Sequence, residues 1–278
     1  MTRSALLAVP LFLLLTSGAL RAQQAAPAPG AEQQPVTSSD EAVQPPPMTP
    51  RQKAEMRADI LVARKEYAAA ASAYEKILAT DKKNAALLNK IGMAYQQLGD
   101  NGKAESYYKR AWKYDKHFAS AMNNLGTVEY GRRRYKNAIK YYNKALPVGT
   151  DRATIYSNLG YAYCGKKDYY HATIAFEKAL ALNPQIFAQR GDFGSLFLQR
   201  SAPDPGTVYY LMAKSYAKLG DAKETAHYLI LARDAGYKDL RAAEKDASFK
   251  RVIGSPQVQE VLRTPAPFGI GKQGPVRD

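Results

Sequence analysis

The chain has 278 residues, 46% of them hydrophobic, and a formal net charge of +15. This length allows one long array or two compact domains, and the hydrophobic content is ordinary for a soluble protein. Cys164 is the only cysteine, which excludes an intrachain disulfide, and the three histidines show no metal-ligand spacing. We therefore expect no disulfide scaffold, no metal site and no cofactor.

Residues 1–22 have the layout of a secretory signal peptide. Arg3 gives a positively charged start, and an apolar run from Ala5 to Leu15 leads to small residues that end at Ala22. The run is shorter than the roughly 20 residues that a membrane-spanning helix needs. We predict export to the periplasm or beyond, with cleavage near Ala22, and a retained membrane anchor is the alternative. No later segment is long and apolar enough to span a bilayer.

Residues 23–50 are rich in Pro, Ala and Gln and contain no aromatic residue. Such a segment buries too little apolar surface to offset the entropy lost on ordering. We predict a disordered linker, which is either a spacer from a membrane or wall or a simple tether. The Pro- and Gly-rich residues 264–278 are expected to form a disordered tail.

Between these ends, small and bulky residues recur with a period of 34. Three columns show it: Ala58, Gly92, Gly126 and Gly160; Ala70, Ala104, Ala138 and Ala172; and Tyr74, Tyr108, Tyr142 and Phe176. Several columns in one register are stronger evidence than any single motif. They predict stacked structural repeats, each contacting its neighbours.

The fourth period carries a complete motif. It has Tyr156, Leu159, Gly160 and Tyr163, followed by Ala172, Phe176 and a closing Pro184. This pattern resembles the tetratricopeptide repeat (TPR), a helix-turn-helix unit of 34 residues. We expect Gly160 to let the two helices approach closely, Tyr163 and Phe176 to fill the gap beside it, and Pro184 to end the unit.

The resemblance implies an all-α fold, an α-solenoid of about five TPR repeats of the bacterial exported type. We place repeats 1–4 at residues 51–184 and a fifth at 206–238. Residues 185–205 lack the signature and are interpreted as an insertion packed on the array, with a degenerate repeat as the alternative. Residues 239–263 are predicted to cap the last repeat with short helices.

In the TPR family the first helices of the repeats line a concave groove that holds a peptide or another protein. The resemblance implies that Asn124 and Asn158, two residues before the close-contact glycines, bind a peptide backbone, since an amide both donates and accepts. The second repeat has Lys90 at this position. The alternative is that these amides serve only the hydrogen bonding of the repeat itself. The predicted groove residues are Asn89, Lys90, Met93, Asn123, Asn124, Tyr130, Ser157, Asn158 and Tyr161.

The functional prediction is a non-enzymatic scaffold of the cell envelope that binds a protein or peptide partner. Residues 1–50 contain two basic and three acidic residues, so the rest of the chain carries +16. This charge is typical of a solubilising surface. It also supports an alternative function, the binding of an anionic partner such as a cell-wall polymer, an acidic lipid surface or a nucleic acid.

No catalytic constellation or phosphate-binding loop stands out in the sequence. Asp192 and Asp204 are the acidic residues of the irregular 185–205 segment, and we expect neither to be catalytic. We therefore predict no enzymatic activity and no small-molecule substrate.

Overall fold

The computed structural model describes residues 47–187 and 202–264, and every regular element within these residues is helical. The α-helices are α1 (Pro50–Ala63), α2 (Tyr67–Leu78), α3 (Ala85–Gln97), α4 (Asn101–Tyr114), α5 (Ala119–Gly131), α6 (Tyr135–Ala145), α7 (Arg152–Gly165), α8 (Tyr169–Leu182), α10 (Pro205–Leu219), α11 (Ala222–Asp234) and α12 (Pro256–Arg263). Two short 3₁₀ helices, η1 (Leu240–Glu244) and η2 (Ala247–Phe249), precede α12.

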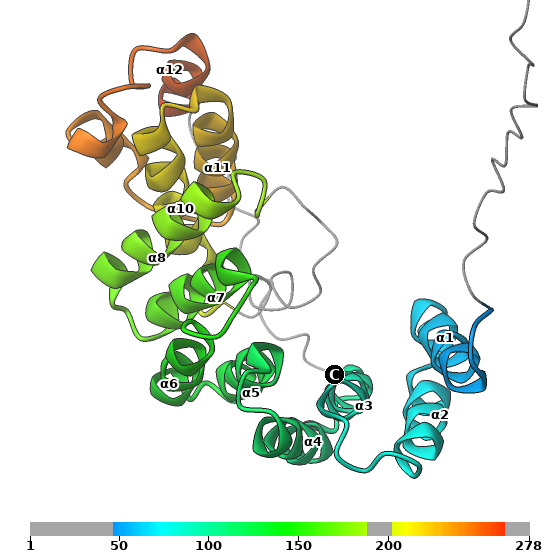
Figure 1. Cartoon of the computed structure of the whole chain (residues 1–278). Helices are drawn as coiled ribbons and strands as arrows, with labels where there is room; N and C mark the ends of the chain where they lie inside the picture. The colour runs from blue at the N-terminus through cyan, green and yellow to red at the C-terminus, as the bar shows by residue number, and fades with distance from the viewer. Residues whose placement is uncertain (1–46, 188–201, 265–278) are drawn as a thin grey trace, which may run out of the picture. The chain divides into compact units, whose positions relative to one another are not determined.

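The helices pack as consecutive pairs. α1 and α2, α3 and α4, α5 and α6, α7 and α8, and α10 and α11 form five pairs, and each pair packs against the next (Figure 1). The first helices of successive pairs also touch, since α3 contacts α5 and α5 contacts α7. The predicted α-solenoid of about five repeats is confirmed.

The positions at which the helices begin follow from local chemistry. Thr49 and Gln52 form a capping box at the start of α1, where Pro50 takes the first position, which needs no N–H donor. Most later helices begin after an Asp or Asn whose side-chain oxygen accepts a backbone N–H three residues on. These caps are Asn84, Asp100, Asp151, Asp168, Asp204 and Asp221.

Within each of three pairs, an aromatic ring of the second helix lies directly on a glycine of the first. A Cβ atom on Gly92 would lie 2.5 Å from the ring of Tyr108. The same distance is 2.4 Å from Gly126 to Tyr142 and 2.3 Å from Gly160 to Phe176. The glycine column therefore exists because the ring occupies the space of a side chain. The expectation that Tyr163 fills this gap is wrong, because its ring stacks on His171 with centroids 5.2 Å apart.

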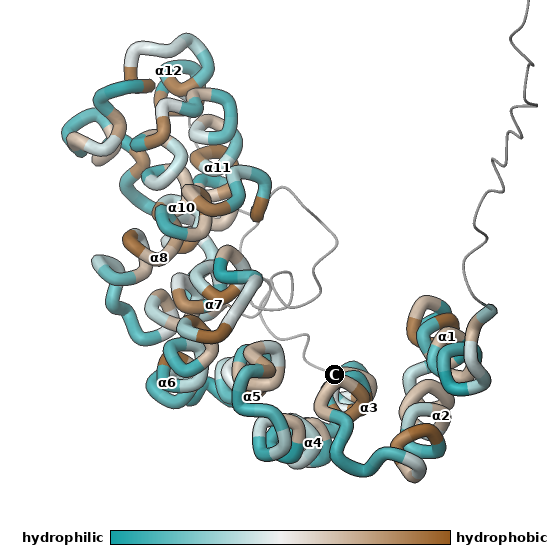
Figure 2. The backbone as a smooth tube through the Cα atoms, viewed as in Figure 1, coloured by the Kyte–Doolittle hydropathy of each residue, from teal (hydrophilic) through white to brown (hydrophobic). Residues whose placement is uncertain are grey.

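Hydrophobic residues are distributed along the whole stack, as Figure 2 shows. The buried ones form two clusters, one in the first two pairs that also includes Ala121 of α5, and one that extends from the second pair to α12. Trp112 packs against both clusters, as expected for a side chain at the joint between two units. The apolar surface is thus buried between neighbours, which is the mode of stabilisation of repeat proteins.

The turn inside each of the first four repeats belongs to its own 34-residue column, and the fifth repeat turns at Gly220, with φ of 85°. Lys65, Gly99, Arg133 and Lys167 all have a left-handed backbone, with φ of 63°, 79°, 59° and 63°. Only one of the four is a glycine, the residue that adopts this conformation at least cost. The turn geometry is therefore imposed by the packing of the paired helices, and the sequence alone gives little sign of it.

Parts of the predicted organisation lie outside the described residues: 1–46, 188–201 and 265–278, which include the predicted leader, most of the linker and the tail, the greater part of the insertion, and Asp192. Asp204 is described, and it caps α10 by accepting hydrogen bonds from the N–H and hydroxyl of Thr207, at 3.1 and 2.6 Å. The C-terminal segment ends in short helices that pack on α10 and α11, as predicted for a cap. None of the described helices is long and apolar enough to cross a membrane.

The contact between glycine and ring predicts the result of Gly126→Ala. The added methyl group would lie 2.4 Å from Tyr142, so the variant should lose about 1–3 kcal/mol of unfolding free energy in urea denaturation. Gly102→Ala is the control, because its Cβ would meet only Asp100 Oδ1, at 3.5 Å. That variant should be neutral or up to about 1 kcal/mol more stable, owing to the higher helix propensity of alanine. Equal stability of the two variants would show that the contact is not tight.

Candidate functional site

A cleft of about 470 Å³ opens between the first helices of the first two repeats. Its walls come from α1 and α3, its base from two tyrosines of α2, and one side from the residue that precedes α5. The lining is largely apolar and consists of Asp59, Val62, Tyr67, Tyr74, Ala86, Asn89, Lys90, Met93, Ala94, Gln97 and Phe118. The size lies within the range of about 300–1,000 Å³ that is usual for ligand pockets.

An ion pair crosses this cleft from one repeat to the next. Lys90 Nζ lies 2.8 Å from Asp59 Oδ1 and 3.0 Å from Oδ2, and the hydroxyl of Tyr74 donates to the same carboxylate. Burial opposes ionisation of Asp59, but the hydrogen bonds from Lys90 and Tyr74 outweigh it and lower the pKa of Asp59. The cleft therefore holds a carboxylate and an ammonium that neutralise each other.

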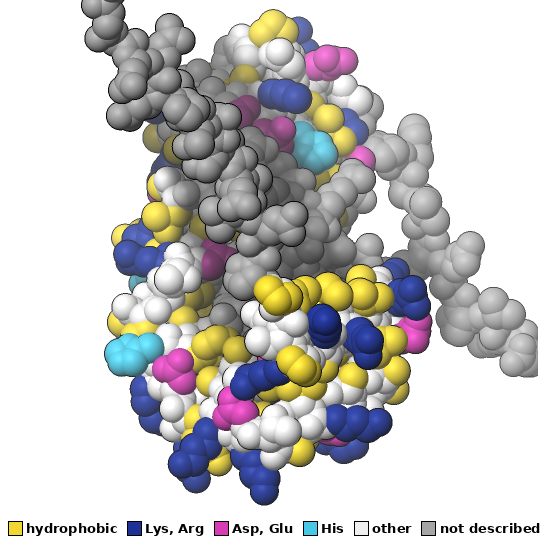
Figure 3. Space-filling view, turned by 45° about the vertical axis from the view of Figure 1, so that its right-hand side comes forward, with side chains coloured by type: hydrophobic (Ala, Val, Ile, Leu, Met, Phe, Trp, Pro, Cys, Tyr) yellow, Lys and Arg dark blue, Asp and Glu magenta, His cyan; other side chains and the backbone are white. Residues whose placement is uncertain are grey.

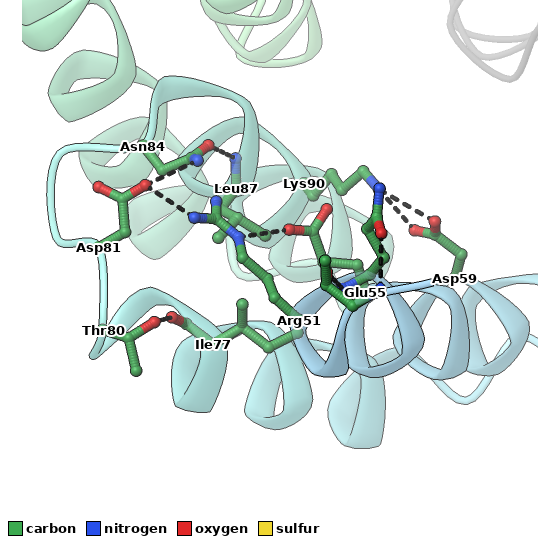
Figure 4. Close-up of polar contacts among 11 residues, drawn as sticks. Arg51, Glu55, Asp59, Ile77, Thr80, Asp81, Asn84, Leu87 and Lys90 are labelled. Atoms are coloured by element: carbon green, nitrogen blue, oxygen red, sulfur yellow. Dashed lines mark hydrogen bonds and ion pairs between the residues drawn. The ribbon is translucent and has the colours of Figure 1, made fainter. Parts of the chain in front are cut away.

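A second set of polar contacts fixes α1 against the loop that leads into α3 (Figure 4). Arg51 bonds Glu55 at 3.0 Å within α1 and reaches Asp81 at 3.2 Å. Asp81 also accepts from the amide of Asn84, whose oxygen caps α3. The two helices that form the cleft are thus connected near the start of α1 and again at Asp59.

Asparagine side chains continue this connection from repeat to repeat. The amide nitrogen of Asn124 donates to Asn89 Oδ1 at 2.9 Å, and that of Asn158 donates to Asn123 Oδ1 at 2.8 Å. Both bonds join residues 35 apart, so they link the first helices of adjacent repeats. The amide nitrogens of Asn124 and Asn158 therefore bond to the preceding repeat, not within their own repeat as the alternative supposed.

The structure divides the nine predicted groove residues into two groups. Asn89, Lys90 and Met93 line the cleft, and the Met93 side chain is 48% exposed. Asn123 and Asn124 are half-buried, and Asn123 also lines a smaller cleft of about 80 Å³ at the start of α5 and α7. Lys90, Met93, Asn123 and Asn124 lie on or beside a surface that a partner can reach, whereas Asn89 lines the cleft but is itself buried, at 6% exposure.

The other four predicted residues are buried, which corrects their assignment to an open groove: Tyr130, Ser157, Asn158 and Tyr161. The ring of Tyr161 packs edge-on against Phe176, with centroids 5.4 Å apart, and Tyr130 packs in the same way against Tyr135. Ser157 Oγ and Asn158 Oδ1 are buried and have no hydrogen-bond partner among the described residues. Buried predicted residues thus occur on both α5 and α7, whereas the cleft lies between α1 and α3.

Sequence reasoning missed Asp59, Val62, Tyr67 and Phe118, which contribute to the cleft. The 34-residue period could have identified one of them, because Asp59 stands 34 residues before the predicted groove residue Met93. The others could not be identified in this way, since Phe118 enters from the segment between two repeats and Tyr67 from a second helix.

The described residues provide neither a metal-binding cluster nor an accessible thiol. They contain no group of three or more His, Cys, Asp or Glu side chains that could hold a metal ion. Cys164 is buried, and burial raises the pKa of its thiol, which disfavours the reactive thiolate.

Comparison with known proteins agrees with this architecture. Residues 117–185 match one tetratricopeptide repeat family model, and residues 85–118 match another. No curated protein matches the sequence.

Two solved structures share the fold. A crystal structure of PilW, described as a widely conserved type IV pilus biogenesis factor, is similar with a TM-score of 0.52 and 18% identity over 78% of this chain and 100% of that one. PilF of Pseudomonas aeruginosa is similar with a TM-score of 0.51 and 20% identity, over 76% of this chain and 86% of that chain. At these identities the likeness concerns the fold alone.

The asparagine contacts predict different effects for the same change at two positions. Asn158→Asp places a carboxylate at a fully buried site and should cost about 2–4 kcal/mol of unfolding free energy at pH 7. Asn124→Asp at the half-buried position should cost less than about 1 kcal/mol. Burial raises the folded-state pKa of the carboxyl introduced at position 158, so its penalty should appear as pH rises above about 4 and disappear below. Equal penalties in denaturant titrations at pH 7 would contradict the assigned burial.

Proposed function

This chain is a tetratricopeptide repeat protein, and we propose that it is a non-enzymatic scaffold that binds an extended segment of a partner protein along α1, α3 and α5. The observation that carries the proposal is the open apolar cleft beside a row of amides on these first helices. An extended chain needs both apolar pockets for side chains and polar groups for its backbone.

The cleft supplies the apolar contacts. Met93 is half-exposed at its mouth, and an unbranched thioether adapts to side chains of different shape. Val62 and Phe118 add apolar surface on either side. Because Asp59 and Lys90 already neutralise each other, the cleft favours an uncharged side chain of the partner.

The neighbouring amides supply the backbone contacts. Asn123 uses its oxygen and Asn124 its nitrogen in the bonds between repeats, and no other hydrogen bond of either side chain occurs among the described residues. One donor group on Asn123 and one acceptor on Asn124 therefore remain for a ligand. A peptide group needs one of each.

We place the scaffold in the cell envelope, either periplasmic or secreted. The support is the sequence of residues 1–22, with its basic start, apolar run and small residues before Ala22. The Pro-rich segment that follows would separate the repeats from the site of export.

A photo-crosslinking side chain at Met93 should capture the partner in native cells, because this position opens into the cleft. The same probe at Tyr170, which is 74% exposed on α8, should not capture it. Met93→Glu should then weaken binding of the purified partner at least about 10-fold, since it places a charge in an apolar contact.

Leu182→Glu is the matched control, because Leu182 is 53% exposed and lies outside the cleft. It should leave the dissociation constant unchanged. Circular dichroism spectra of both variants should match that of the original chain. A partner that binds the Met93 variant as tightly as the control would exclude the cleft as its site.

Export makes a separate prediction. Purified from its native cells, the protein should begin near Gln23, and its intact mass should lack the first 22 residues. Replacing Leu13 and Leu14 by Arg interrupts the apolar run and should leave the uncleaved chain in the cytoplasm. A native protein that retains Met1 while outside the cytoplasm would indicate an anchor.

A further inference from the structure

The second helices carry a charge pattern that the cleft does not explain. α6 contains Lys136, Lys140 and Lys144 and no acidic residue. The three lysines are four residues apart, so they form one stripe along the helix, and all three are exposed. None of them takes part in an ion pair among the described residues.

The neighbouring acidic side chains are already engaged. Glu105 on α4 pairs with Lys109 and with Arg132, at 2.5 Å in each case. Glu129 is buried in α5 and accepts hydrogen bonds from Arg132, Arg134 and Asn137, at 3.0, 3.4 and 2.8 Å. These bonds fix the joint between the second and third repeats, and they leave no carboxylate for the stripe on α6.

The stripe continues onto α4 and the adjoining turns. On α4, α6 and the turns beside them, the exposed cations that form no ion pair with a described residue are Lys113, Lys116, Arg133, Lys136, Lys140 and Lys144, and we call this set the α4/α6 face. The two helices are connected through Arg132, which stands three residues before α6 and lies 2.5 Å from Glu105 of α4. Figure 3 shows Lys and Arg side chains projecting from the lower edge of one face of the molecule.

The shape of the α4/α6 face indicates what kind of partner it binds. None of the four clefts described in the structure is lined by a residue of α4 or α6. Proteins that hold a single-stranded nucleic acid use a charged groove with stacking aromatic rings. Here the principal exposed aromatic side chain is Tyr114, at 41%, and Trp112 is half-buried with Lys116 Nζ 5.4 Å from its ring centre.

We propose that the α4/α6 face docks on an anionic lipid bilayer. Six uncompensated cations on long flexible stems match a layer of anionic head groups without any built pocket, and Tyr114 suits the interfacial region. Docking through this face leaves the first helices, on the other side of each pair, free to bind a partner. The inference does not depend on the proposed peptide binding.

The test compares two triple variants of the full chain with the same change in net charge. Lys136→Gln, Lys140→Gln and Lys144→Gln remove the stripe, whereas Lys238→Gln, Lys245→Gln and Lys250→Gln remove three exposed lysines near the C-terminal cap. Co-sedimentation gives partition coefficients into phosphatidylcholine vesicles with and without phosphatidylglycerol. Their ratio cancels any binding that does not depend on the anionic lipid.

The ratio should fall by about 100-fold when the stripe is removed, because each lysine near such a surface contributes roughly a factor of five. It should fall by less than about threefold in the C-terminal variant, and the preference should decline with salt. Equal losses in both variants would overturn the proposal, since net charge alone would then be responsible. Binding of double-stranded DNA or polyphosphate through the same lysines, without binding to vesicles, would assign the face to a soluble polyanion and would also overturn it.

Discussion

The contact between a small residue and an aromatic ring, with glycine in three of the repeats and Ala58 in the first, packs the paired helices together and also reaches the candidate site. The ring fills the space over the glycine, and its hydroxyl extends to the first helix. Tyr108 donates to Gln96 at 2.7 Å, whereas Tyr74, in the first repeat, donates to Asp59. The aromatic column that packs the paired helices together therefore also orients the Asp59 carboxylate in the cleft. In the fourth repeat Phe176 keeps the packing and has no hydroxyl.

Residues at the same position of successive repeats differ in their exposure. Met93 is 48% exposed, whereas Thr127 and Tyr161, 34 and 68 residues later, are 3% and 2% exposed. Thr127 and Tyr161 lie on α5 and α7, and each of these helices contacts a first helix on both sides: α3 and α7 for α5, and α5 and α10 for α7. The surface available to a ligand therefore lies toward the first repeats, although the motif is most complete in the fourth.

The two sides of the helix pairs differ in their electrostatics. In the cleft, the Asp59 carboxylate and the Lys90 ammonium cancel, so apolar and amide groups dominate. On the α4/α6 face, Glu105 and Glu129 are used at the joint between repeats, and the lysines of α6 stay uncompensated. The ion pairs between the second and third repeats thus stabilise the stack, and the unpaired lysines beside them leave a positive electrostatic potential on the α4/α6 face. A scaffold with these two sides can hold a partner on one while its other side meets an anionic surface.

By itself the sequence determined the helix pairs, their 34-residue period and the tight contact at Gly92, Gly126 and Gly160, because these depend on residue size at fixed spacing. It also singled out Asn89, Lys90 and Met93, which line the cleft. Only the tertiary structure decided that Tyr161 and Asn158 are buried, that the ring of Tyr163 packs elsewhere, and that Lys65, Arg133 and Lys167 adopt a left-handed turn. Burial and turn geometry depend on how neighbouring repeats pack, and a residue's place within its own repeat does not contain that information.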